Sequence, residues 1–261
     1  MGAPVVRGLD RRVRIYPNLA TETAGLARHV AERARESVRA RGVFSIVLSG
    51  GQTPQGLYRL LARRYRERFP WHATEVFFGD ERCVSPRNPE SNYAMARKAL
   101  LSHVPVDPRR VHRLPGEVRP PSVAAARYAR LIGPLPARSD AARARFDLVL
   151  LGLGPDGHTA SLFPGTPALR EQRRTVVAVR RSGQSPYVPR LTLTPRALNS
   201  SREVCFLVSG KEKAAPVAAV FHAPPEGDRQ FPASLVRAMG ATFWFLDRGA
   251  AQDLPPEVRG H

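Results

Sequence analysis

A histidine and an aspartate two residues apart are the residues of this chain best suited to proton-transfer chemistry. Asp156 and His158 lie in a glycine-rich run at 152–159 that reads GLGPDGHT. An imidazole titrates near neutral pH and can act as a general base toward water, and a nearby carboxylate can hold its orientation. The pair predicts a reaction in which water attacks an electrophile, with His158 as the base. The alternative is a structural or solvent-facing histidine, which is how we interpret the other six.

The same run imitates the Gly-x-Gly-x-x-Gly fingerprint of dinucleotide-binding folds. Three features speak against a dinucleotide here. The run follows a middle strand instead of the first, Pro155 makes the turn rigid, and no acidic residue ends a second strand about 20 residues later to bind a ribose.

A second loop has the composition of a phosphate-binding turn. Residues 49–54 read SGGQTP, after an apolar run and before a helical pattern. Gly50 and Gly51 would let the backbone approach a ligand, Thr53 offers a hydroxyl, and the positive end of the following helix attracts an anion. The alternative is an ordinary strand-to-helix turn with Thr53 as the helix N-cap. The run matches neither a Walker loop nor a Gly-x-Ser-x-Gly elbow.

Charged residues gather at the end of another apolar run, in the segment GDER at 79–82. Asp80 and Arg82 predict recognition of a hydroxylated or phosphorylated ligand, because arginine can grip phosphate or carboxylate through two parallel hydrogen bonds. A structural Asp–Arg pair that closes the loop is the alternative. Arg190 and Lys213 could each reach the same ligand or face solvent.

Short apolar runs alternate with helical patterns along the chain, which is typical of a parallel sheet flanked by helices. The expected strands are 13–16, 43–48, 75–78, 146–151, 175–179, 204–208 and 242–246. The expected helices are 20–39, 54–64, 91–101, 122–131 and 212–220. We predict a single α/β domain over residues 1–261, with one doubly wound, mostly parallel sheet and helices on both faces. Ligands bind such sheets beyond the carboxyl ends of the strands, where the three loops above should meet.

The charge balance invites a nucleic-acid function that the distribution of charge does not support. The chain has 41 Lys and Arg residues against 22 Asp and Glu residues, a net charge of +19. The arginines are scattered in pairs and short clusters instead of forming a tail or alternating with aromatic residues. We interpret most of them as solvated helix faces and expect no nucleic-acid partner. The excess still favours an anionic substrate.

The chain also lacks the signals of a membrane or secreted protein. No run of about 18 apolar residues is present, and Met1 to Arg12 lacks the apolar stretch of a secretory signal. We expect a cytoplasmic protein with no membrane partner. Cys83 and Cys205 are far apart and outside any Cys-x-x-Cys pattern, so neither a disulfide framework nor a zinc site is indicated. We expect Cys83 to be a small buried filler.

Taken together and in this order, five segments resemble the 6-phosphogluconolactonase family. They are 48–54, 79–82 with 91–93, 152–164, 190–194 and 210–214, within a similarity that spans about residues 13–250. The resemblance implies a Rossmann-like α/β domain related to the sugar-phosphate deaminases. It also implies hydrolysis of 6-phospho-D-glucono-1,5-lactone to 6-phosphogluconate in the oxidative pentose phosphate pathway, without a cofactor or a metal.

The related glucosamine-6-phosphate deaminases share the Asp-Gly-His turn but continue into Phe-Asn-Glu-Pro, where the glutamate partners the histidine. Here the corresponding stretch ends in Leu162, Phe163 and Pro164 and lacks that acid. Lactone hydrolysis needs one base and a water, so we favour the lactonase and keep the deaminase as the alternative. The chain departs from the lactonase pattern at 85–87, at the outer rim of the expected pocket.

The residues and the resemblance together assign roles within the expected site. His158 would be the base, with Asp156 as its partner, and Asp80 and Arg82 would contact the sugar hydroxyls or the carboxylate end. The expected phosphate-binding residues are Gly50, Gly51, Thr53, Arg190 and Lys213. The oxyanion would be stabilised by backbone N–H groups near 154–158 or by Arg82. The partner would be a phosphorylated sugar lactone, and we expect a monomer, with a homodimer as the alternative.

Overall fold

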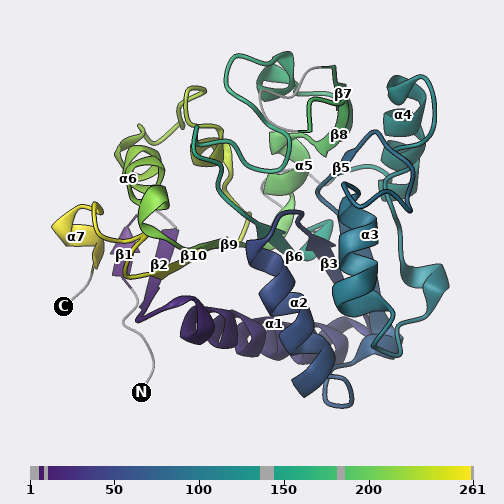
Figure 1. The fold of residues 1–261 in the computed structure, drawn as a ribbon, viewed down its shortest axis with the longest axis horizontal. Coiled ribbons are helices and arrows are strands. Elements are labelled where there is room, and N and C mark those ends of the chain that lie inside the picture. The colour runs from purple at the N-terminus through teal and green to yellow at the C-terminus, as the bar shows by residue number, and fades with distance from the viewer. Residues whose placement is uncertain (1–5, 9–10, 136–143, 181–185, 260–261) are drawn as a thin grey trace.

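The structure is a computed structural model that describes residues 6–8, 11–135, 144–180 and 186–259 (Figure 1). Part of Met1 to Arg12 therefore lies outside the described residues. The strands are β1 (Val6–Gly8), β2 (Arg11–Tyr16), β3 (Phe44–Leu48), β4 (Thr74–Phe78), β5 (Asp80–Arg82), β6 (Phe146–Leu151), β7 (Val176–Val179), β8 (Arg190–Leu193), β9 (Ser201–Val208) and β10 (Ala241–Asp247). The helices are α1 (Leu19–Arg41), α2 (Thr53–Arg64), α3 (Asn92–Ala96), α4 (Pro121–Ile132), α5 (Pro195–Asn199), α6 (Ala214–His222) and α7 (Pro256–Arg259).

Seven strands form the main sheet, in the order β1-β2-β10-β9-β6-β3-β4. Every neighbouring pair in it is parallel except β1 with β2. From β3 the chain adds β4 on one side, then crosses back to place β6 on the other side of β3 and continues to β9 and β10. The direction of strand addition therefore reverses between β3 and β6, which is where open α/β sheets bind their ligands.

Helices cover both faces of this sheet, as predicted. On one face, His29 of α1 packs on the rings of Phe243 and Phe245 in β10. On the opposite face, Phe221 of α6 meets Trp244, whose ring stacks on Phe206 at a centroid distance of 4.0 Å. The doubly wound α/β fold is thereby confirmed.

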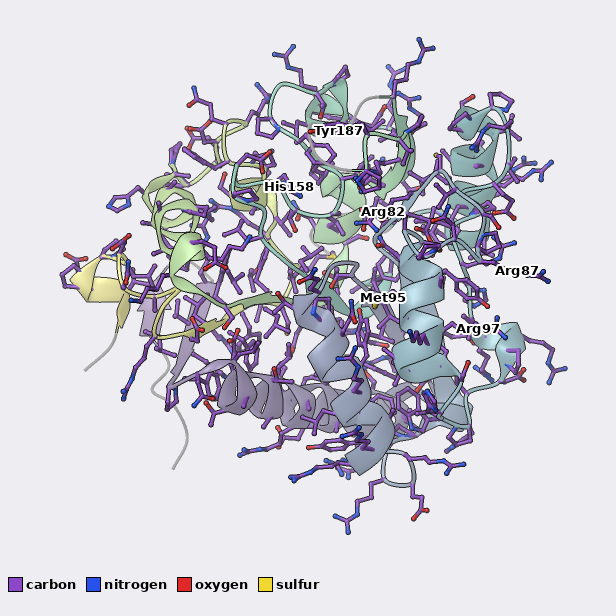
Figure 2. The ribbon with its side chains drawn as sticks, in the orientation of Figure 1. Arg82, Arg87, Met95, Arg97, His158 and Tyr187 are labelled. Atoms are coloured by element: carbon purple, nitrogen blue, oxygen red, sulfur yellow. The ribbon has the colours of Figure 1, made fainter. Side chains whose placement is uncertain are left out.

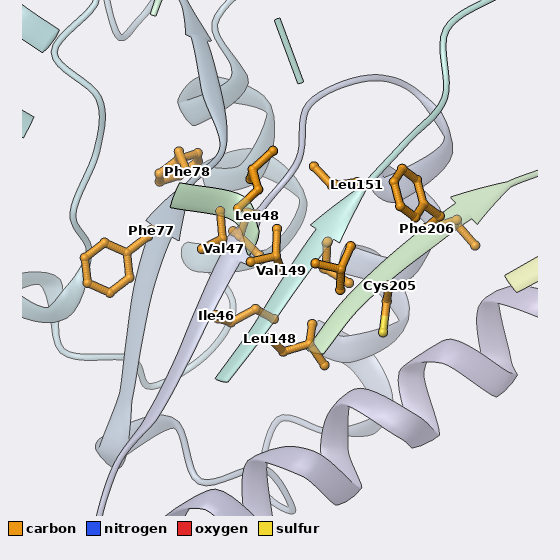
Figure 3. Packing of buried hydrophobic residues seen from close by; sticks show 14 of the residues in the cluster. Ile46, Val47, Leu48, Phe77, Phe78, Leu148, Val149, Leu151, Cys205 and Phe206 are labelled. Atoms are coloured by element: carbon orange, nitrogen blue, oxygen red, sulfur yellow. The ribbon is translucent and has the colours of Figure 1, made fainter. Parts of the chain in front are cut away.

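The two central strands β3 and β6 are buried along their whole length. Side chains that alternate along a strand serve both faces, and Figure 3 shows Cys205 of β9 on the side of α1 while Phe206 points the other way. Parallel strands covered on both faces need apolar residues at nearly every position, which is why these runs were recognisable in the sequence.

A second, three-stranded antiparallel sheet has the order β5-β8-β7 and was not predicted as such. The expected strand 175–179 exists as β7, but it belongs to this small sheet and not to the main one. β5 was interpreted as a charged loop, and β8 was not predicted as a strand. Both are three or four residues long, so neither carries enough alternation to be recognised from pattern alone.

Two predicted helices have a different form in the structure. The helix expected at 91–101 begins as α3 and continues as one π-helical turn over Arg97–Leu101. The helix expected at 212–220 begins as a 3-10 turn over Lys211–Lys213 and continues as α6. The 3-10 turn is tighter than an α-helical turn, and the π-helical turn is wider. Both lie at one end of the predicted helix and leave its position in the chain unchanged.

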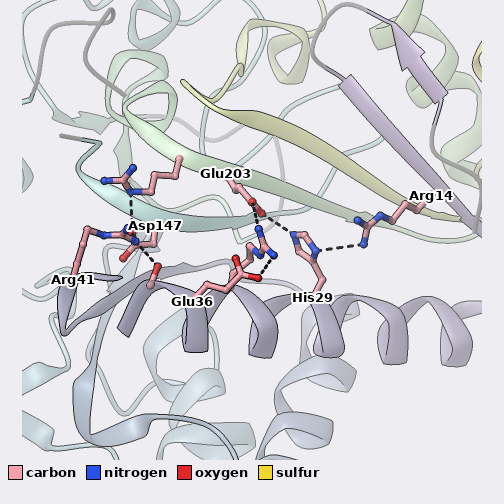
Figure 4. Close-up of polar contacts among 9 residues, drawn as sticks. Arg14, His29, Glu36, Arg41, Asp147 and Glu203 are labelled. Carbon is pink, nitrogen blue, oxygen red and sulfur yellow. Dashed lines mark hydrogen bonds and ion pairs between the residues drawn. The ribbon is translucent and has the colours of Figure 1, made fainter. Parts of the chain in front are cut away.

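Some of the arginines hold buried acids on the α1 side of the sheet (Figure 4). Asp147 of β6 lies 2.7 Å from Arg41 and 3.2 Å from Arg202. Glu203 of β9 lies 2.7 Å from Nε2 of His29 and 3.5 Å from Arg33. These arginines therefore neutralise carboxylates under α1 instead of only facing solvent. Among the described helices, none combines the length and the apolar character needed to cross a membrane.

Glu22 in the first turn of α1 gives a prediction for the pH dependence of stability. Burial, together with the charge of Asp247, raises the pKa of Glu22 from its ordinary 4.5 to about 9. Between these values the folded chain holds a proton that the unfolded chain releases, so stability present at low pH is lost as pH rises, by up to about 1.4 kcal/mol per pH unit. Glu22→Gln removes this loss, so the unfolding free energy of the variant should improve relative to the parent chain from pH 5 to pH 8.

Urea denaturation at pH 5, 6.5 and 8 measures this difference. Glu32→Gln is the matched control, because Glu32 is exposed on the same helix. A difference between Glu22→Gln and the parent chain that stays constant with pH would contradict the protonated state of Glu22.

Candidate functional site

A cleft of about 400 Å³ opens where the carboxyl ends of β3 and β6 meet the small sheet. This volume lies within the usual range for small-molecule sites. Every predicted site residue except Asp156 lines it: Gly50, Gly51, Thr53, Asp80, Arg82, His158, Arg190 and Lys213. Figure 2 shows His158 and Arg82 above α2 in this view, with Arg82 at the end of β5 and His158 in the loop after β6.

The imidazole of His158 is fixed by Asp156. Nδ1 of His158 lies 2.5 Å from Oδ1 of Asp156. The centroid of the His158 ring lies 4.6 Å from the centroid of the Phe163 ring. Burial alone would raise the pKa of Asp156, but the hydrogen bond and charge of His158 lower it below its ordinary value. An ionised carboxylate only accepts, so Nδ1 is the ring nitrogen that carries a proton, and when the ring holds one proton Nε2 is the acceptor. This arrangement can take a proton from water.

The loop that carries His158 is closed by its own hydrogen bonds. Gly154 N–H donates to the carbonyl of His158 at 2.8 Å, and Gly157 N–H donates to the carbonyl of Gly154 at 3.1 Å. Thr159 Oγ1 donates to the carbonyl of Gly152 at 2.8 Å. A Cβ at position 154 would overlap Nδ1 of His158. The ring is therefore seated against a position that only glycine can occupy.

Asp80 joins three parts of the cleft wall. Its carboxylate accepts from Asn92 Nδ2 at 3.0 Å and from Ser161 Oγ at 2.6 Å, and only 6% of the residue is exposed. Asp80 thus ties β5 to the start of α3 and to the segment that follows His158. The sequence indicated that Asp80 belongs to the site, and the segment 91–93, which holds Asn92, was part of the family resemblance. It gave no separate role to Ser161.

The neighbouring Glu81 was given no role and is used inside the protein. Its carboxylate accepts from the backbone N–H groups of Asn92 at 2.7 Å and Tyr93 at 2.9 Å, and from Ser91 Oγ at 2.9 Å. Burial raises the pKa of Glu81, while these hydrogen bonds oppose the rise. Glu81 therefore caps the first turn of α3 and holds Asn92 in place.

The pairing of β5 with β8 places two arginines opposite each other. The register sets Arg82 across from Arg190. Arg82 donates to the carbonyl of Glu90 at 2.5 Å, and Arg190 donates to that of Pro186 at 3.1 Å. Burial lowers the pKa of Arg190, and the charge of Arg82 lowers it further although Asp80 opposes the change. Like charges directly opposite on paired strands repel, so an anion bound between them would be favoured.

The start of α2 is left uncapped toward the cleft. The N-cap is Gln52, and it makes no side-chain capping hydrogen bond, so the alternative role of Thr53 as N-cap is wrong. Gly51 has a φ of 98°, and a Cβ added to it would meet nothing within 4 Å, whereas at Gly50 the side chain of Asn92 fills that space. Pro54 has no N–H group, and Gln55 N–H already donates to the carbonyl of Gln52 at 3.1 Å, so the N–H of Thr53 is the donor of this first turn that an anion could accept from.

Lys213 connects the loop after β9 to the loop after β6. Its Nζ donates to the carbonyl of Leu153 at 2.9 Å. Both residues line the cleft. The ammonium group is thus held beside the His158 loop instead of extending into solvent.

A candidate set of metal ligands lies away from this cleft. Among the described residues, His29, Glu203 and Cys205 are the one group whose ligand atoms lie within 4.8 Å of one another. They sit between α1 and the sheet, where Arg14 and Arg33 contact His29 and Glu203. Two neighbouring cations oppose a bound cation, so we interpret the group as an ion-pair network. Both cysteines are buried and free, as expected for Cys83.

Comparisons with known proteins place the chain among sugar-phosphate enzymes. The family model described as glucosamine-6-phosphate isomerases/6-phosphogluconolactonase matches residues 18–244. A 6-phosphogluconolactonase of Synechocystis is 40% identical over 227 residues, which cover 87% of this chain and 91% of that protein. A 6-phosphogluconolactonase of Mycobacterium tuberculosis is 38% identical, over 95% of this chain and 100% of its own. The crystal structure of 6-phosphogluconolactonase from Thermotoga maritima is 30% identical with a TM-score of 0.78, over 91% and 99% of the two chains.

Gly154→Ala tests how tightly the imidazole is seated. The added Cβ should rotate the ring away from Asp156 and destabilise the fold by about 1–3 kcal/mol through overpacking. Nitrogen chemical shifts of the imidazole and urea denaturation measure the two effects. Gly152→Ala is the matched control, because a Cβ there meets nothing within 4 Å. An unchanged Nδ1 signal in Gly154→Ala would contradict the described contact.

Proposed function

Since this chain belongs to the glucosamine-6-phosphate isomerase/6-phosphogluconolactonase family, we propose that it hydrolyses 6-phospho-D-glucono-1,5-lactone to 6-phosphogluconate. The observation that carries the proposal is the pairing of His158 with Asp156 at the edge of a cleft that also holds Arg82, Arg190 and Lys213. A base and several cations that line one cleft fit a substrate with a lactone carbonyl and a phosphate. One chain supplies all of these groups, which supports a monomer as the active form.

His158 is proposed to activate water for attack on the lactone. Nε2 takes a proton from water as its oxygen bonds to C1, which gives a tetrahedral intermediate with a negative oxygen. Asp156 stabilises the imidazolium that forms, because its carboxylate already accepts from Nδ1. The C1 bond to the ring oxygen then breaks, and Nε2 returns the proton to that oxygen. Water has been added across the ester bond, and His158 is again neutral.

Arg82 is the better supported of the two candidates for stabilising the oxyanion. Within the loop, the N–H groups of Gly154 and Gly157 donate to loop carbonyls, and that of His158 donates to Asp156. Pro155 has no N–H group. The loop thus has few donors left for a ligand, whereas Arg82 lines the cleft with five donors in its guanidinium group.

The phosphate is proposed to bind between the start of α2 and the cations Arg190 and Lys213. The uncapped N–H groups around Gly51 and Thr53 supply donors at the positive end of the helix dipole. Binding the phosphate there would hold the lactone carbonyl near His158. Asp80, whose oxygens already accept from Asn92 and Ser161, would shape the wall that faces the sugar hydroxyls.

The deaminase alternative is less well supported. A ring-opening deaminase uses a second acid beside its histidine, and the chain has Leu162 and Phe163 in that region. Both are buried apolar residues, and Asp156 is the carboxylate that contacts His158. The relatives from Synechocystis and Mycobacterium tuberculosis, which are 40% and 38% identical and cover most of this chain, are named 6-phosphogluconolactonases.

His158→Ala tests the proposed base. Without it, turnover of 6-phosphogluconolactone should fall roughly 10²- to 10⁴-fold, because general base catalysis contributes that much. Proton release, corrected for spontaneous lactone opening, measures the rate, and ammonia release from glucosamine 6-phosphate is measured in parallel. The control is His103→Ala, since His103 is exposed. Near-normal turnover by folded His158→Ala would remove His158 from the mechanism, and deamination without lactone hydrolysis would favour the alternative.

Arg190→Ala and Lys213→Ala test the proposed phosphate end. Each should raise KM roughly 10- to 100-fold, because a hydrogen bond to a charged group is lost. The preference for the phosphorylated lactone over glucono-1,5-lactone should shrink by the same factor, with kcat little changed. Arg35→Ala, at an exposed position of α1, controls for the loss of net charge. An unaltered substrate preference in both variants would place the phosphate elsewhere in the cleft.

A further inference from the structure

We propose that Asp247, at the end of β10, is a positioning residue that sets the affinity for the phosphate group by fixing the loop that carries Lys213. Asp247 is not among the residues that line the cleft, and no pattern in the sequence pointed to it. The inference deepens the proposed function and rests on it where Lys213 is assigned to the phosphate.

The carboxylate of Asp247 is bound by three groups from two segments. Gly210 N–H donates to both of its oxygens at 3.1 Å, and Ala250 N–H donates to Oδ1 at 2.8 Å. Ser209 Oγ donates to Oδ2. Leu246 of β10 is in register with Val208 of β9, so the two chains leave the sheet side by side. Asp247 therefore holds the first two residues after β9 from the neighbouring strand.

These contacts continue to the ammonium group in two steps. The carbonyl of Gly210 accepts from Lys213 N–H at 3.0 Å and so closes the 3-10 turn Lys211–Lys213. The side chain of Lys213 then reaches the carbonyl of Leu153 at 2.9 Å. A shift of Gly210 would move the start of this turn, and with it the position of Nζ relative to the cleft.

The turn after β10 also supports the loop by contact. At Gly249 a Cβ would lie 3.1 Å from the backbone nitrogen of Lys211 and 3.3 Å from the carbonyl carbon of Gly210. The loop thus rests on Asp247 through hydrogen bonds and on Gly249 through packing. Changes at Asp247 and at Gly249 can therefore disturb the loop although neither residue itself lines the cleft.

Asp247→Asn is the direct test, because the amide keeps the size of the side chain but presents a donor where the carboxylate accepted. We expect KM for 6-phosphogluconolactone to rise roughly 5- to 30-fold, because one part-buried donor loses its acceptor and the loop shifts. The value of kcat should stay within about 3-fold, and kcat/KM for glucono-1,5-lactone should be unchanged, because that substrate has no phosphate. Asp253→Asn is the matched control, with the same charge change at an exposed position of the following turn.

The double variant Asp247→Asn with Lys213→Ala separates positioning from general stability. If Asp247 acts through Lys213, the double variant should match Lys213→Ala alone within about 2-fold, since the two changes remove one effect. A purely structural role predicts instead equal losses on both lactones and additive losses in the double variant, and either result would overturn the proposal.

Two further measurements keep the proposal testable if Asp247→Asn folds poorly or the lactone is not the substrate. Gly249→Ala should also raise KM for the phosphorylated lactone and spare the other. Inorganic phosphate binding, measured by calorimetry, should weaken in Asp247→Asn and Gly249→Ala while amide exchange at Gly210 speeds up.

Absence of lactone hydrolysis by the parent chain, with these binding effects present, would refute the proposed function alone. Normal phosphate binding by both variants would refute the role of Asp247.

Discussion

The pairing of β3 with β6 is the constraint on which the rest of the molecule depends. Ile46 lies in register with Leu148, and Val47 with Val149, inside a pair of strands buried along their whole length. The chain reverses its direction of strand addition at this pair, so the segments that leave the two carboxyl ends diverge. The space between them is the cleft. A change that shifted this register would separate the turn at 49–54 from the histidine loop, although neither loop had changed.

The excess of positive charge is used differently at the two ends of the sheet. Under α1, the carboxylates of Asp147 and Glu203 are both matched by arginines. At the carboxyl ends, Arg82 and Arg190 stand opposite each other, and the nearby carboxylates of Asp80 and Glu81 accept hydrogen bonds from Asn92, Ser161 and Ser91. Field lines concentrate in such a concave site and attract an anionic ligand.

The sequence predicts the parts of this protein that obey strong local rules. The strand Phe146–Leu151 was predicted with its observed bounds, because a buried parallel strand must be apolar throughout. The convergence of three loops followed from the topology rule. The opposition of Arg82 and Arg190 could not be predicted, because it depends on the register of two very short strands. Two further features could not be predicted from the sequence. The start of α2, where Gln52 makes no side-chain capping hydrogen bond, depends on backbone angles. The contacts of Asp247 depend on Gly210, which lies 37 residues away in sequence.

The junction at Gly79 joins the buried main sheet to the small sheet that forms one wall of the cleft. This single residue joins the end of β4 to the start of β5, and its carbonyl accepts from Leu193 N–H at 2.8 Å. Gly79 N–H also donates to the carbonyl of Leu48 at 3.0 Å, which fixes it to the end of β3. One residue therefore contacts the last residue of a central strand and the last residue of β8. A displacement of its backbone would reach the buried sheet and the cleft wall together.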